Sequence, residues 1–143
     1  MLIEFRVANF RSFKGENRLS LVASSDKDLE ATNVASTGNP SVPRVLRAAA
    51  IYGANASGKS NLIRAFQLFR GLVVDSANIN PEAALNIQPF RLDPENETAA
   101  TEFEITFLQD GIRYQYGFAL TSKRVIEEWL LVYKTRQPQN WFT

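Results

Sequence analysis

The sequence contains neither cysteine nor histidine. Without cysteine, disulfide bonds and thiolate metal sites are excluded. Without histidine, the chain lacks the side chain that most often serves as a general base or as a metal ligand. The chemistry of this chain must therefore come from carboxylates, lysine, arginine, hydroxyl groups and the backbone.

A strong net charge and a long apolar segment are absent as well. Sixteen basic and fifteen acidic residues give a net charge of +1, so no global field directs the protein to nucleic acid or to an anionic membrane. Glu4, Arg6 and Arg11 interrupt the apolar pattern of the N-terminus, which excludes a signal peptide, and no apolar run reaches membrane-spanning length. We therefore expect a cytoplasmic protein with no membrane partner. With 45% of its 143 residues hydrophobic, the chain can form one domain with a core.

The segment "GANASGKS", residues 53–60, matches the pattern G-x-x-x-x-G-K-[ST]. An apolar run over 45–52 precedes it, and apolar residues at helical spacing follow it from Leu62 to Val73. A phosphate-binding loop requires this context, with a strand before it and a helix behind it. The alternative is a glycine-rich helix cap that holds no ligand.

The residue types in this pattern suit a polyphosphate. The glycines let the backbone come close, so that backbone N–H groups and the positive end of the helix dipole converge on the phosphates. Lys59 would reach the β- and γ-phosphates, and the Ser60 hydroxyl would bind Mg²⁺. The sequence therefore predicts a nucleotide site here.

The segments around this loop predict its surroundings. Strands are expected over 2–10, where apolar and charged residues alternate, and over 17–23, with a turn between them that contains Gly15. Residues 24–44 are rich in turn formers and predict a mobile surface loop, with a helical turn near "DKDLEA". The apolar run that follows predicts a buried parallel strand, and the helix after the phosphate loop should end at about Asp75.

Beyond a second irregular stretch over 76–100, the pattern changes to short strands. The dipeptide Asp110-Gly111 is a strong signal for a type I′ turn, in which both residues need positive φ. The strands on its two sides and the one after them predict an antiparallel meander. Its three strands are expected over 101–108, 112–120 and 124–134.

Three carboxylates outside the loop stand in sequence contexts that resemble a Walker B motif or a catalytic dyad. Asp75 ends "GLVVD", which resembles a Walker B motif, but the motif lies within the helix period and favours a solvated helix end. Glu127 and Glu128 are adjacent on a strand, so their side chains point to opposite faces and do not form a dyad.

Other polar and aromatic residues also have two interpretations. Gln88 could contact Mg²⁺, although a loop amide beside a proline has simpler explanations. The meander aromatics Tyr114, Tyr116, Phe118 and Trp129 could stack on bases, but we favour core packing. Four basic residues are expected to be surface charges, with a role in a functional patch as the alternative: Arg44, Arg47, Lys123 and Arg124.

Four segments together resemble the N-terminal half of an ABC-type ATPase head, of the branch that includes RecF, SMC and OLD-like proteins. They are "IEFRVANFRSF", "AAIYGANASGKSNLIRAF", "FEITFLQDGIRYQYGF" and "VIEEWL". More closely, the chain is similar to bacterial AAA-family ATP-binding proteins of that branch, many of which belong to phage-defence or abortive-infection systems. The resemblance covers nearly the whole chain.

The resemblance implies an α/β P-loop NTPase fold with ATP and Mg²⁺ as ligands. Residues 1–143 would be the N-terminal part of one ATP-binding domain. Arg11 would lie beside the nucleotide, on the α-phosphate or the adenosine, with Phe13 packing nearby, and Asn55 would lie near the γ-phosphate. Ala56 stands where many relatives have glycine. The implied nucleotide-binding residues are Arg11, Gly53, Ala54, Asn55, Ala56, Ser57, Gly58, Lys59, Ser60 and Asn61, with Ser60 also on Mg²⁺.

Parts that an ABC-type ATPase needs do not occur in the sequence: a Walker B acid, a signature motif and a switch histidine. We therefore expect a fragment, a chain of which only part is represented, or one piece of a split ATPase. On its own it should bind nucleotide poorly and turn it over negligibly. The resemblance also implies a homodimer or higher homo-oligomer through the ATP site, which controls an effector such as a nuclease or toxin, and it leaves DNA as a further partner.

Three alternatives remain. A P-loop kinase or GTPase predicts parallel β-α units after the loop, and the hairpin at Asp110-Gly111 disfavours it. A nucleotide-dependent assembly scaffold would sense ATP without turnover. A DNA-repair or SMC-like ATPase would act in association with DNA.

Overall fold

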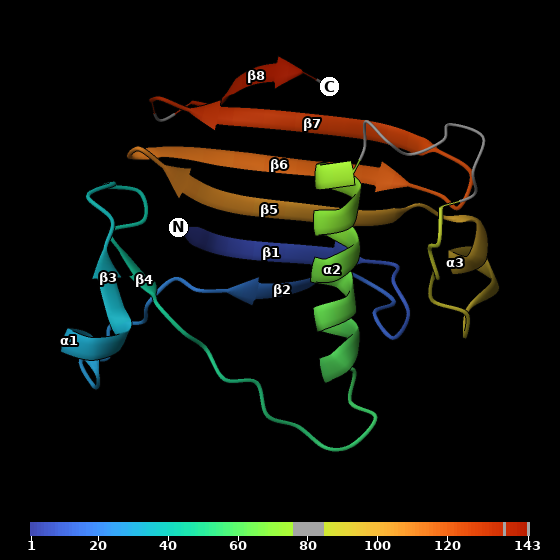
Figure 1. Ribbon diagram of the computed structural model, residues 1–143, viewed down its shortest axis with the longest axis horizontal. Helices are drawn as coiled ribbons and strands as arrows, with labels where there is room; N and C mark the ends of the chain where they lie inside the picture. The colour runs from blue at the N-terminus through green and yellow to red at the C-terminus, as the bar shows by residue number, and fades with distance from the viewer. Residues whose placement is uncertain (76–84, 136, 143) are drawn as a thin grey trace.

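The computed structural model describes residues 1–75, 85–135 and 137–142, which form a mixed α/β fold. A six-stranded, wholly antiparallel sheet has the order β2-β1-β5-β6-β7-β8, and helix α2 lies across one of its faces (Figure 1). The elements are β1 Leu2–Ala8, β2 Asn17–Ser20, α2 Lys59–Asp75, β5 Thr101–Gln109, β6 Ile112–Leu120, β7 Val125–Tyr133 and β8 Gln139–Phe142.

The N-terminal strand is confirmed, and it lies inside the sheet. The alternate side chains of Ile3, Phe5 and Val7 are buried, as the period of two requires. On one side β1 pairs with β2, the second predicted strand, which ends at Ser20. On the other side it pairs with β5, about a hundred residues later in the chain. This long-range pairing joins the two ends of the sequence in one sheet.

Helix α2 packs against the sheet through aromatic residues. Phe66 stacks on Phe5 of β1 with ring centroids 3.9 Å apart, and Phe69 stacks on Phe118 of β6 at 5.1 Å. Ala65 is fully buried between them. The spacing of apolar residues therefore predicted both the helix and its end at Asp75. The aromatic packing holds the N-terminus of α2 in place relative to the sheet.

The predicted buried parallel strand over 45–52 is wrong. Only its first residues are extended, in β4 Arg44–Leu46, which pairs antiparallel with β3 Val34–Ser36. From Arg47 to Gly58 the chain has no strand, and Tyr52 is 90% exposed. A buried strand needs neighbouring strands for its N–H and C=O groups, and beyond the hydrogen bonds of Arg47 and Ala48 with Asn33 no strand of the described ranges pairs with these residues. In Figure 1 the segment between β4 and α2 runs clear of the sheet.

The two predicted loops contain regular structure. In the region 24–44 the predicted helical turn is present as α1 Glu30–Asn33, and the strand β3, which was not expected, follows it. In the region 76–100, residues 76–84 lie outside the described part of the chain, and the short helix α3 Pro94–Thr98 follows. Asp93 caps α3 by accepting a hydrogen bond from the N–H of Glu95. Of the helices in the described ranges, none is both long and apolar enough to cross a membrane.

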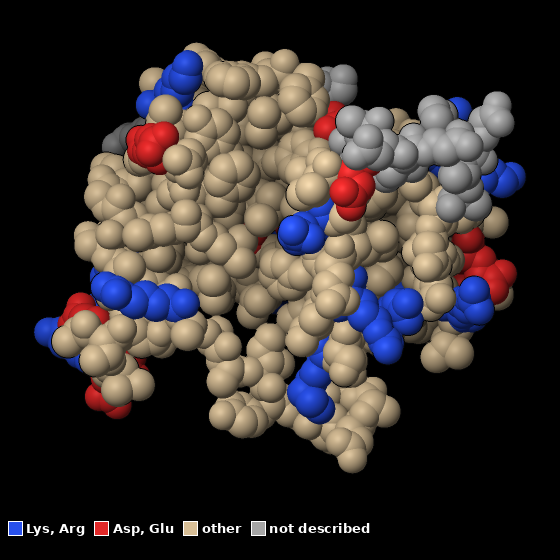
Figure 2. Space-filling view, viewed as in Figure 1, with Lys and Arg blue, Asp and Glu red and all other residues tan. Residues whose placement is uncertain are grey.

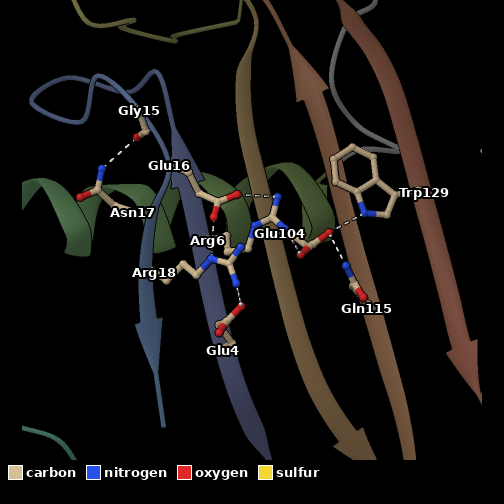
Figure 3. Close-up of polar contacts among 9 residues, drawn as sticks. All are labelled: Glu4, Arg6, Gly15, Glu16, Asn17, Arg18, Glu104, Gln115 and Trp129. Carbon is tan, nitrogen blue, oxygen red and sulfur yellow. Dashed lines mark hydrogen bonds and ion pairs between the residues drawn. The ribbon is translucent and has the colours of Figure 1, made fainter. Parts of the chain in front are cut away.

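The sheet face opposite α2 carries a buried polar cluster (Figure 3). Glu104 is 5% exposed, and its carboxylate pairs with Arg6 at 3.2 Å. It also accepts hydrogen bonds from Gln115 at 2.8 Å and from the indole N–H of Trp129 at 2.9 Å. The predicted core packing therefore holds for Phe118, which packs beneath α2, whereas Trp129 packs on this polar face across from Gly117.

The turn between β5 and β6 is confirmed as left-handed at both central residues, with φ of 52° at Asp110 and 75° at Gly111. We predict that Gly111→Val destabilises the protein by about 1–2 kcal/mol, because a β-branched side chain is strained at this φ. Thermal unfolding measures the effect. Gly15→Val is the matched control, since Gly15 has ordinary φ and open space around it. An equal melting temperature for the two variants would contradict the prediction.

Candidate functional site

The segment 53–58 leads directly into helix α2 and borders an open pocket. The pocket has a volume of about 470 Å³ and is lined by residues 55–61 and by Arg64. Because α2 is anchored to the sheet by its aromatic residues, its N-terminus is held at a fixed place beside the turn that follows β1. The glycine-containing loop that borders the pocket is therefore held at its C-terminal end by a helix that packs on the sheet.

Backbone conformation explains the glycines of this loop. Gly58 has φ of 93°, and a Cβ there would lie 2.8 Å from the Ser12 hydroxyl oxygen. A Cβ at Gly53 would lie 2.8 Å from the hydroxyl oxygen of Ser57. Ala56 has φ of 63°, the left-handed conformation that costs a residue with a Cβ about 1–2 kcal/mol. The loop thus keeps the conformation that glycine adopts easily, although alanine stands at this position.

Several residues that line the pocket have a backbone N–H without a partner among the described residues. The N–H groups of Ala56, Gly58, Lys59 and Ser60 have no hydrogen-bond acceptor among the described residues. The first N–H groups of a helix have no partner within it, and they lie at the positive end of the helix dipole. Such a group of donors is suited to an anion.

Two side chains of the motif complete this donor set. The Lys59 ammonium donates to the carbonyl oxygens of Gly53 at 2.6 Å and Ala54 at 2.7 Å, so it lies at the beginning of the loop. The Ser60 hydroxyl is exposed and has no hydrogen-bond partner within the described ranges. Both side chains are therefore placed where a ligand in the pocket could reach them.

The turn after β1 packs against the loop. The Ser12 hydroxyl oxygen accepts a hydrogen bond from the Asn61 side chain at 3.0 Å, and the ring of Phe13 lies near Gly58 and packs against the core. The N–H of Arg11 donates to the carbonyl oxygen of Gln88 at 2.8 Å. The segment of Gln88 therefore lies beside the turn that holds Arg11, and neither residue lines the pocket.

Sequence reasoning missed two residues of this site. Ser12 has no signal of its own in the sequence, because its contact with Gly58 depends on the packing of α2 across β1. Arg64 lines the pocket and follows Ser60 by four residues. That spacing places both on the same side of a helix, so the helical period was a signal that could have found it.

The carboxylates singled out in the sequence lie elsewhere. Asp75 is exposed at the far end of α2, roughly 25 Å from the loop for a helix of 17 residues. Glu127 and Glu128 are both exposed, and Glu128 accepts a hydrogen bond from the Tyr116 hydroxyl at 2.7 Å. Burial, and then this carboxylate, raise the pKa of the Tyr116 phenol. No Asp or Glu lines the pocket, and the described residues contain no group of three acidic metal ligands.

Comparison with known protein families finds a match that covers the loop and α2. Residues 48–142 match the family described as "AAA domain, putative AbiEii toxin, Type IV TA system". The match includes the loop, α2 and strands β5 to β8, and leaves out the strands β1 and β2. A search of curated proteins found no match. Since the matched segment spans well over half of the sequence, the chain belongs to this family of AAA domains.

Proposed function

We propose that this chain binds ATP through the phosphate loop at the N-terminus of α2. The observation that carries the proposal is the row of N–H groups at Ala56, Gly58, Lys59 and Ser60, which have no acceptor among the described residues and belong to residues that line one pocket. Membership of an AAA-domain family supports a nucleotide as the anion. The proposed contacts are residues 53–61, with Arg11 beside them.

The residues present fit a magnesium ion that arrives with the nucleotide. Mg²⁺ takes oxygen ligands and is commonly held by one or two protein groups together with substrate phosphates and water. The Ser60 hydroxyl would be the protein ligand, and no carboxylate lines the pocket. When bound, the ion would neutralise phosphate charge.

We further propose that ATP controls association of the protein with a second copy, which in turn controls an effector such as a nuclease or toxin. The pocket lacks a carboxylate that could position a water molecule, so an ATPase site would need an acid from outside the pocket. The toxin–antitoxin wording of the family description supports a defence role. The same lack of an acid also favours a second candidate, a scaffold that senses ATP without hydrolysing it.

The test is a titration of residues 1–143 with Mg²⁺-ATP, followed by amide NMR, together with an assay of phosphate release. We expect the amide signals of the loop residues to shift, and phosphate release to equal that of Lys59→Ala. Absence of any shift in the loop would refute the binding site. Hydrolysis that disappears in Lys59→Ala would show that a carboxylate we place outside the site, Asp75 or Glu128, is catalytic.

Association is tested separately by sedimentation of the protein with ATP and with ADP. We expect a larger species with ATP, because only the triphosphate would complete the contact surface around the γ-phosphate. Identical sedimentation with both nucleotides would leave ATP binding standing and remove nucleotide-controlled association.

A further inference from the structure

We infer that Arg64, which lines the nucleotide pocket on the side next to the turn that holds Arg11, forms a second phosphate-binding position separate from Lys59. The inference rests on the proposed function, because it concerns the same ligand. It assigns to Arg64 the recognition of the phosphate next to the nucleoside.

Hydrogen bonds place Arg64 at the side of the pocket next to the turn after β1. Its guanidinium donates to the side-chain oxygen of Asn61 at 3.2 Å, and Asn61 in turn donates to the Ser12 hydroxyl at 3.0 Å. Arg11 precedes Ser12 in the same turn. Lys59 is directed to the carbonyl oxygens of Gly53 and Ala54 instead. The pocket therefore has two cationic positions, one on each side of the loop.

The two guanidinium groups repel each other and lack a counter-charge. Burial lowers the pKa of Arg11, and the nearby charge of Arg64 lowers it further. The Nε atom of Arg11 is buried and has no hydrogen-bond partner. Within the described ranges, neither arginine forms an ion pair with a carboxylate, whereas Arg6, Arg18 and Arg44 each do. An anion bound between them would remove this repulsion.

The distribution of charge on this side of the molecule agrees with an anionic ligand. Basic side chains gather over the part of the molecule where the N-terminal half of α2 lies in Figure 1, and no acidic atoms lie among them on this face (Figure 2). A nucleotide that entered the pocket from this face would therefore meet cations and no carboxylate near the N-terminal half of α2.

Arginine matches the geometry of one particular part of the nucleotide. Its planar guanidinium binds phosphate oxygens in a bidentate manner. The lysine of a phosphate loop reaches the β- and γ-phosphates. This leaves the α-phosphate for the position at Arg64. Since ATP and ADP share the α-phosphate, Arg64 should contribute equally to the binding of both.

The test compares Arg64→Gln with Arg70→Gln in titrations with ATP and with ADP. Arg70 is the matched control, because it is an exposed arginine on the same helix and does not line the pocket. We expect Arg64→Gln to weaken both nucleotides by about tenfold to a hundredfold and by the same factor, with Arg70→Gln unchanged. The melting temperature should stay at the wild-type value, because Arg64 is exposed.

The outcomes separate this inference from the proposed function. If Lys59→Ala loses ATP while Arg64→Gln binds both nucleotides like the wild type, the inference is wrong and the proposed function stands. Weakening of ATP alone would overturn the assignment to the α-phosphate. If the wild type binds no nucleotide, titration with inorganic pyrophosphate decides the matter. If pyrophosphate binds and Arg64→Gln weakens that binding, Arg64 is supported as an anion-binding residue although ATP is not the ligand. If pyrophosphate does not bind either, the inference and the proposed function are both wrong.

Discussion

Lys59→Ala is expected to lose ATP binding and to keep its fold. The ammonium contacts the carbonyl oxygens of Gly53 and Ala54 and the hydroxyl of Ser57, all within the loop, so no core packing depends on it. In the bound state the same ammonium would make a charge-assisted contact with phosphate, which is worth about 1.5–3 kcal/mol. Its loss corresponds to about 10- to 150-fold weaker binding.

Calorimetry or NMR titration with ATP measures this effect, and circular dichroism measures the melting temperature of the same samples. Arg47→Ala serves as the control, because Arg47 is also an exposed cation, lies directly after β4 and does not line the pocket. We expect its ATP affinity to equal that of the wild type. An unchanged ATP affinity in Lys59→Ala would remove the phosphate-loop assignment.

Gly117→Ala is expected to destabilise the sheet strongly. A Cβ at this position would lie 2.4 Å from the ring of Trp129 and 2.7 Å from the carbonyl oxygen of Phe103. The ring could turn away, but it would then lose its hydrogen bond to the buried carboxylate of Glu104. The carbonyl oxygen belongs to β5, which pairs with β6 at this point and cannot move alone. We expect a loss of about 1–3 kcal/mol, as for other overpacked sites.

Urea unfolding, followed by tryptophan fluorescence, measures the free energy of unfolding of this variant. Gly71→Ala is the control of opposite sign, because Gly71 lies in α2 with open space around its Cα, and alanine favours a helix by roughly 0.5–1 kcal/mol over glycine. If Gly117→Ala were as stable as the wild type, the close packing of Trp129 on this glycine would be refuted.

Local patterns in the sequence predicted the parts of the fold that local interactions control. The alternation of Ile3, Phe5 and Val7 predicted β1, and the spacing of apolar residues after the loop predicted α2 to its last residue. Asp110-Gly111 predicted the left-handed turn, because few residues other than Asn, Asp and Gly adopt positive φ without strain. The motif itself predicted the pocket residues from Asn55 to Asn61, since they are consecutive in the chain, but the predicted residues Arg11, Gly53 and Ala54 do not line the pocket.

The prediction failed where a segment depends on distant neighbours. The apolar run over 45–52 has the composition of a buried strand, but composition does not specify which strands lie beside it, and most of the run is exposed. The aromatic ring of Trp129 predicts core packing, whereas the register of β6 and β7 places it across from Gly117 and beside Glu104.

The sequence by itself determined that this protein has the motif of a phosphate loop in front of a helix, because the spacing of Gly53, Gly58, Lys59 and Ser60 is a local property. Only the tertiary structure decided what surrounds that loop. Packing of α2 across β1 brings Ser12 against Gly58 and places the turn of Arg11 beside Arg64, residues more than 45 positions apart in the chain. Such contacts follow from burial of the helix aromatics against the sheet, and no periodicity within either segment encodes them.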